Sequence, residues 1–138
     1  MRDLPRQLSA DELAELFNGR TRFVELLAKH EQPLTRADAL IKELPYADKL
    51  AAIETHPRIG ERSDEQRGDE PEVLAELAAL NRAYEERFGF RFIVFVNRRP
   101  RRELIPVLRG RLERTRDEEI DTALHELVAI AKDRWSKE

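Results

Sequence analysis

The sequence contains no cysteine, no long apolar run and no large excess of either charge. Without cysteine the chain can form no disulfide, no thiolate metal site and no cysteine nucleophile, so redox chemistry does not fix its compartment. Lysine and arginine number 25 against 28 acidic residues, which gives a formal net charge of −3. A protein that binds nucleic acid through bulk charge usually has a clear basic excess. The composition therefore argues against a nucleic-acid partner, and we interpret the local basic run at residues 98–102 as a solvated turn.

No apolar stretch approaches the roughly 20 residues that a membrane-spanning helix needs. Residues 1–5 also lack the apolar core of a secretory signal. We therefore expect a soluble cytoplasmic protein with no membrane partner. A length of 138 residues fits one domain and allows a sizeable core, so we predict a single domain over residues 1–138.

Helical periodicity dominates the rest of the sequence. Ser9-Ala10-Asp11-Glu12 matches a capping box, in which the serine and the glutamate satisfy each other's backbone N–H groups, and the helix that follows is expected to stop at Gly19. Apolar spacing and turn residues predict further helices at about residues 21–29, 35–43, 71–88, 101–113 and 115–135. Thr35 is expected to cap the helix at 35–43, and a second capping box precedes the helix at 115–135. Another helix is expected to begin at Pro45, with Leu50, Ala51 and Ile53 facing inward. The pattern predicts an all-α fold, a single bundle of about seven helices.

Two segments break this periodicity. Residues 55–70, about sixteen residues punctuated by proline and glycine, form a long central loop, and such loops are usually functional or disordered. Residues 90–96 are aromatic and β-branched, as in a strand. Because no second strand is available to pair with them, we interpret them as a buried extended connection or the start of a helix.

The long loop holds the first candidates for chemistry. His56 follows directly on a predicted helix, and its imidazole can give or take a proton near neutral pH. The alternative is a histidine that only stabilises the turn. Glu65 lies nine residues further on and can fold back toward His56, although a carboxylate in a charged loop is often simply solvated. The other histidines, His30 and His125, are expected to be structural or exposed.

Arg134 is the second unusual position. The helical period places it on the apolar stripe of the last helix, seven residues after Leu127. A guanidinium that faces a core should find an anion, either an internal carboxylate or the carboxylate of a substrate. Arg87 occupies a similar edge and is a weaker candidate. The histidines lack the spacing of metal ligands, so no metal site is predicted.

Three blocks of sequence together resemble one family. They are residues 56–62 (His-Pro-Arg-Ile-Gly-Glu-Arg), residues 80–93 (Leu-Asn-Arg-Ala-Tyr through Phe-Gly-Phe-Arg-Phe-Ile) and residues 123–134. In this order they are similar to the OHCU decarboxylases, the 2-oxo-4-hydroxy-4-carboxy-5-ureidoimidazoline decarboxylases of urate degradation. The resemblance extends from about Leu13 to Trp135.

The resemblance implies a carboxy-lyase that needs no cofactor, converts OHCU to (S)-allantoin and is usually a homodimer. The family's catalytic histidine and glutamate correspond to His56 and Glu65. Its substrate-binding positions correspond to Pro57, Ser63, Gln66, Phe90, Phe92, Ile93 and Arg134.

Two other functions stay open, the first of them because of one departure from the family pattern. Ser63 and Glu65 are separated by one residue, whereas the family motif has two. A related enzyme that acts on a different ureido or carboxylated heterocycle is therefore the second hypothesis. The third is a helical interaction module without activity, in which His56, Glu65 and Arg134 would not share a pocket.

Overall fold

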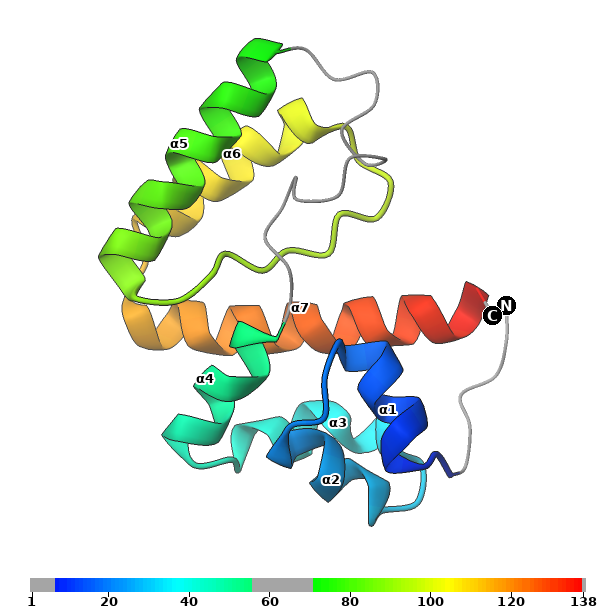
Figure 1. Ribbon diagram of the computed structural model, residues 1–138. Helices are drawn as coiled ribbons and strands as arrows, with labels where there is room; N and C mark the ends of the chain where they lie inside the picture. The colour runs from blue at the N-terminus through cyan, green and yellow to red at the C-terminus, as the bar shows by residue number, and fades with distance from the viewer. Residues whose placement is uncertain (1–6, 56–70, 138) are drawn as a thin grey trace.

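The computed structural model describes residues 7–55 and 71–137, which form seven helices and no strand (Figure 1). The helices are α1 (Ala10–Phe17), α2 (Arg22–Ala28), α3 (Pro33–Lys42), α4 (Tyr46–Glu54), α5 (Pro71–Phe88), α6 (Arg101–Leu112) and α7 (Arg116–Lys137). The prediction of an all-α fold with about seven helices is confirmed.

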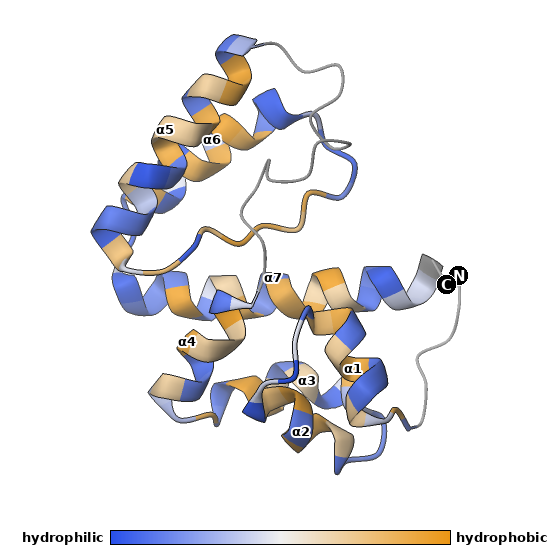
Figure 2. Ribbon diagram, viewed as in Figure 1, coloured by the Kyte–Doolittle hydropathy of each residue, from blue (hydrophilic) through white to orange (hydrophobic). Residues whose placement is uncertain are grey.

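Helix α7 is the central element of the fold. Helices α1, α3 and α4 each pack directly against it, and α2 packs against α1, α3 and α4. Helices α5 and α6 form a pair on the other side of α7 (Figure 1). Apolar residues alternate with polar ones along the helices on both sides of α7 (Figure 2), and Leu124, Leu127 and Ala131 of α7 are buried in the core.

Both predicted capping boxes are present. In α1, the Ser9 hydroxyl accepts from the Glu12 backbone N–H (3.1 Å), and the Glu12 carboxylate accepts from the Ser9 N–H (3.0 Å). Thr115 and Glu118 make the same pair before α7. The bonds with Ser9 lower the pKa of Glu12. Helix α1 ends one residue earlier than predicted, because Asn18 takes the left-handed conformation of the cap (φ 64°).

Two other predicted boundaries are wrong. Helix α3 begins at Pro33, not after Thr35, because a proline with its fixed φ suits the first turn and lacks an N–H that would need a partner. In α4, Pro45 is the residue before the helix, and Ala52 is buried in place of the exposed Ala51. No helix within residues 7–55 and 71–137 is both long and apolar enough to cross a membrane.

Candidate active site

The predicted site residues fall into two groups. Five of them lie outside the described residues, namely His56, Pro57, Ser63, Glu65 and Gln66. The other four are described, namely Phe90, Phe92, Ile93 and Arg134. The geometry therefore concerns the elements that flank residues 56–70 and the four described positions.

Residues 90–96 form a connection without regular secondary structure between α5 and α6, and no helix starts there. Phe90, Phe92 and Ile93 are buried. Tyr84 of α5 packs edge-on against both phenylalanines, with ring centroids 5.8 Å from Phe90 and 5.2 Å from Phe92. Phe90 and Phe92 are thus fixed by the core, as the interpretation of a buried connection predicts.

Arginine side chains bind the backbone carbonyls of this segment. A buried backbone carbonyl needs a hydrogen-bond donor, and the segment belongs to no sheet that would supply one. Arg111 of α6 donates to the Ile93 carbonyl (2.6 Å). Arg99 donates to the carbonyls of Phe95 (2.7 Å) and Val96 (3.0 Å). Arg99 is therefore a structural donor within the basic run at 98–102, which is only partly the solvated turn that we predicted.

A buried ionic network lies behind the same segment. The Glu119 side chain of α7 is fully buried, and its Oε1 accepts from the Tyr84 hydroxyl (2.7 Å) and from Arg111 Nε (2.7 Å). Arg114 Nη1 lies 3.1 Å from the other carboxylate oxygen. Burial, followed by the hydrogen bond with Glu119, raises the pKa of the Tyr84 hydroxyl. The network ties α5, α6 and α7 together at the segment that the family resemblance assigns to the pocket wall.

The C-terminal end of α4, which leads into residues 56–70, is held from two sides. The Thr55 hydroxyl lies 3.2 Å from the Phe17 carbonyl of α1 and 2.9 Å from the Ala52 carbonyl of its own helix. On the other side, Arg91 donates to the Glu54 carbonyl (3.1 Å). The residue that precedes His56 is therefore anchored to α1, and its neighbour is anchored to the segment that carries Phe90 and Phe92.

Arg134 contacts α1 at Leu16, the residue next to the Phe17 that Thr55 contacts. Its Nη1 donates to the Leu16 carbonyl (2.9 Å), and its side chain is half-buried, in keeping with its position on the apolar stripe. Because adjacent Cα atoms are about 3.8 Å apart, the bonds of Arg134 and Thr55 to neighbouring carbonyls place the two side chains within roughly 10 Å of each other. The fold thus brings Arg134 close to the start of the segment that contains His56.

The described site residues do not form one cluster. The Arg116 guanidinium lies 5.6 Å from the Phe90 ring centroid, and Arg116 precedes Arg134 by eighteen residues on α7. At 1.5 Å per residue this separates their Cα atoms by about 27 Å along the helix. The segment then runs toward Arg134, since the Phe95 N–H donates to Glu126 (3.3 Å). Phe90 and Arg134 therefore lie toward opposite ends of α7.

Comparison with known proteins decides the family. The family model for OHCU decarboxylase matches residues 2–136. The chain belongs to the OHCU decarboxylase family. The prediction of an enzyme family of urate degradation is confirmed.

Known proteins of urate degradation are similar to this chain over most of its length. The uric acid degradation bifunctional protein PucL of Bacillus subtilis is 31% identical over 107 residues, which cover 69% of this chain and 22% of that protein. The 2-oxo-4-hydroxy-4-carboxy-5-ureidoimidazoline decarboxylase of Halalkalicoccus jeotgali is 27% identical over 120 residues, or 73% of this chain and 68% of that one. A crystal structure of OHCU decarboxylase in the presence of (S)-allantoin superposes with a TM-score of 0.79 at 25% identity, covering 91% of this chain and 96% of the other.

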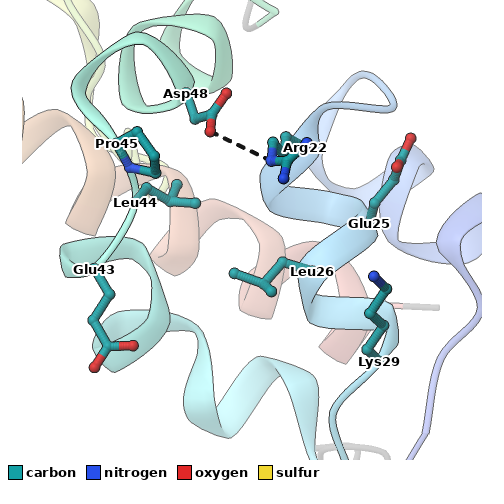
Figure 3. A pocket seen from close by; sticks show the side chains of 8 residues that line it. All are labelled: Arg22, Glu25, Leu26, Lys29, Glu43, Leu44, Pro45 and Asp48. Carbon is teal, nitrogen blue, oxygen red and sulfur yellow. Dashed lines mark ion pairs between the residues drawn. The ribbon is translucent and has the colours of Figure 1, made fainter.

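One cavity of this OHCU decarboxylase family member is lined by none of the four described site residues. It has a volume of about 290 Å³ and is lined by residues of α2, α4 and the end of α3 (Figure 3). The ion pair between Arg22 and Asp48 (3.7 Å) closes one side of it. Its lining is Arg22, Glu25, Leu26, Lys29, Glu43, Leu44, Pro45 and Asp48. Because Phe90, Phe92, Ile93 and Arg134 are absent from its lining, we do not assign the active site to it.

Two of the other residues considered for chemistry, His125 and Arg87, lie on the surface. His125 is exposed, and its Nδ1 lies 3.0 Å from Asp38. Among the described residues no three histidine or acidic side chains gather as metal ligands would. Arg87 is exposed and donates to the Arg114 carbonyl.

The ionic network is what the sequence reasoning missed. Its signal was present, because Arg111 follows Leu104 and Leu108 at the spacing of one buried helical face. The same rule had singled out Arg134, and applied to Arg111 it would have predicted a buried arginine with an acidic partner.

Proposed function

We propose that this chain decarboxylates 2-oxo-4-hydroxy-4-carboxy-5-ureidoimidazoline to (S)-allantoin in urate degradation, without a cofactor. Membership of the OHCU decarboxylase family is the observation that carries the proposal. The fold similarity to an OHCU decarboxylase crystallised in the presence of (S)-allantoin also supports it.

The reaction suits a site built only from side chains. The bond to the leaving carboxylate breaks, CO₂ departs, and the electron pair delocalises into the adjacent unsaturated ring, so no external electron sink is needed. The C4 hydroxyl then loses its proton and becomes the carbonyl of allantoin, while a proton must reach one face of the neighbouring carbon, C5, which carries the ureido group. By the family resemblance, His56 serves as acid or base and Glu65 engages the substrate hydroxyl. A general acid or base contributes about 10²–10⁴-fold to a rate, and orientation supplies much of the rest.

Arg134 suits the task of holding the substrate. A guanidinium forms paired hydrogen bonds with a carboxylate, and Arg134 Nη1 already donates to Leu16, which fixes the side chain. Thr55, the residue before His56, binds the adjacent carbonyl. This proximity supports a shared pocket for His56 and Arg134 and disfavours a helical module without activity.

The finer assignments of place and assembly are also proposals. We propose a homodimer in the cytoplasm with a small-molecule substrate and no nucleic-acid partner, following the family resemblance and the absence of a basic excess. Light scattering during gel filtration tests the assembly. A species of twice the 16.2 kDa chain mass is expected, and a stable monomer at enzyme-assay concentrations would contradict it.

A coupled assay tests the activity. Urate oxidation products are generated freshly and the protein is added, and allantoin is expected to form faster than in the uncatalysed reaction. His56→Asn and Glu65→Gln should each lower the rate by about a hundredfold or more, because each removes a group that handles protons or orients the substrate. His125→Asn is the matched control, since His125 is exposed and paired with Asp38, and its rate should match the wild type. A near-normal rate for His56→Asn would place the chemistry elsewhere.

The spacing of Ser63 and Glu65 favours one alternative. With one residue between them instead of two, the carboxylate can meet a different substrate group, so a related ureido or carboxylated heterocycle is the second candidate. Product identification by NMR across such substrates separates the two. Turnover of another heterocycle with no acceleration of OHCU decay would favour the alternative.

A further inference from the structure

The end of α1 and the two residues after it, residues 16–19, receive side chains from two distant parts of the chain. The final carbonyls of a helix have no partner within the helix and need outside donors. Here Arg134 of α7 donates to the Leu16 carbonyl, and Thr55 at the end of α4 donates to the Phe17 carbonyl. The Leu16 carbonyl thus holds Arg134, and the Phe17 carbonyl holds Thr55, the residue before His56.

Gly19 completes this contact. A Cβ added at Gly19 would lie 2.9 Å from Thr55 Cγ2 and 3.2 Å from Thr55 Cβ, closer than carbon atoms approach without strain. The φ angle of Gly19 lies outside the left-handed region, so glycine is needed there for the close approach of Thr55. Threonine is stiff at its branched Cβ, and its hydroxyl, with a single proton to donate, lies within hydrogen-bond distance of the Ala52 and Phe17 carbonyls. The side chain therefore has little freedom to move away from a larger residue at position 19.

We propose that the C-terminal turn of α1 is the positioning element of the active site: Phe17 and Gly19 fix Thr55, next to His56, while Leu16 orients Arg134. This inference rests on the proposed decarboxylase function. Thr55 and Gly19 are positioning residues that act through their neighbours. A single rigid turn would set the distance between the proton-handling group and the anion-binding group. A misplacement of about 1 Å at a reacting centre can cost up to a hundredfold in rate.

Three substitutions at the contact test the proposal through kcat and KM. Thr55→Val keeps the shape but removes the hydroxyl, and Gly19→Ala inserts a methyl group against Thr55. We expect each to lower kcat about tenfold, with KM changed less than about threefold. Thr55→Ser keeps the hydroxyl and should stay within about twofold of the wild type. The double variant Gly19→Ala/Thr55→Ser removes Cγ2, the nearer of the two atoms that the new methyl group would meet, so it should recover most of the activity that Gly19→Ala loses.

A matched control separates positioning from loss of stability. Thr115→Val is the same substitution at the cap of α7, where the hydroxyl accepts from Glu118, at the end of α7 opposite Arg134. It should lower the melting temperature and leave kcat unchanged. All variants are assayed well below their melting temperatures, which circular dichroism establishes.

The outcomes distinguish failure of the proposed decarboxylase function from failure of the proposed positioning role. If the wild-type protein does not accelerate OHCU decay, the proposed function fails and the inference fails with it. If the wild type is active and Thr55→Val stays within twofold of it, only the inference is overturned. A double variant no better than Gly19→Ala, or a Thr115→Val variant that loses as much kcat as Thr55→Val, would also overturn it.

Discussion

Arg111 is the residue whose replacement should most damage stability without touching the substrate. Its side chain is 8% exposed, its Nε donates to the fully buried Glu119 carboxylate (2.7 Å), and its Nη1 donates to the Ile93 carbonyl (2.6 Å). Its guanidinium also lies 4.5 Å from the Phe92 ring centroid. Arg111→Met keeps much of the apolar volume but leaves the Glu119 carboxylate without its closest cation and the Ile93 carbonyl without that donor.

The cost follows from the buried charge that remains. Removal of one partner from a buried ion pair destabilises a protein by about 3–5 kcal/mol. Unfolding entropy is about 2.1 cal/mol/K per residue, so in a chain of 138 residues each kcal/mol corresponds to roughly 3.5 °C of melting temperature. Arg111→Met should therefore lower the melting temperature by about 10–17 °C.

A second arginine on the same helix provides the control. Arg109 lies two residues away and pairs with Glu76, but the two side chains are 60% and 39% exposed. Exposed pairs contribute about 0–1 kcal/mol, so Arg109→Met should lower the melting temperature by no more than about 4 °C. Thermal unfolding followed by circular dichroism gives both values. Equal losses in the two variants would refute the reasoning that burial makes the Arg111 pair critical.

Tyr84, Gly89 and Gly110 provide the remaining tests. Burial and the hydrogen bond with Glu119 raise the pKa of the Tyr84 hydroxyl in the folded state. Just above pH 10 this hydroxyl therefore ionises only in the unfolded chain, so the free energy of unfolding should fall by about 1.4 kcal/mol per pH unit there. Tyr84→Phe should lack this slope in urea unfolding, and parallel slopes would contradict the assignment. Gly89 has a φ of 81°, so Gly89→Ala should destabilise by about 1–2 kcal/mol. Gly110→Ala, in a helix with open space around the added Cβ, should stabilise by about 0.5–1 kcal/mol, and shifts of the same sign would contradict the comparison.

Local patterns predicted the helices well because they depend on near neighbours in the sequence. The boxes at Ser9–Glu12 and Thr115–Glu118 involve residues three apart, and both formed. At the start of α3 two local signals compete, a proline suited to the first turn and a threonine suited to a cap. Pro33 in the first turn determined that boundary, and Thr35 became an exposed residue inside the helix.

The site was less predictable because its contacts join residues that are distant in the sequence. The helical period placed Arg134 on the apolar stripe but could not name its partner, a backbone carbonyl 118 positions earlier. The helical period likewise cannot predict the hydrogen bond between the Thr55 hydroxyl and the Phe17 carbonyl. The family resemblance supplied the site residues, and the fold then placed Arg134 near the beginning of the segment that carries His56, whereas Phe90 lies toward the other end of α7.

The most direct test of the proposed function is the circular dichroism of allantoin formed from freshly generated OHCU. Protonation by bulk water has no preferred face and gives a racemic product with no signal, whereas an enclosed site delivers the proton to one face. We expect a signal of the (S) enantiomer that grows in proportion to the concentration of this protein and is lost with His56→Asn. Racemic allantoin formed at the rate of the protein-free reaction would contradict it.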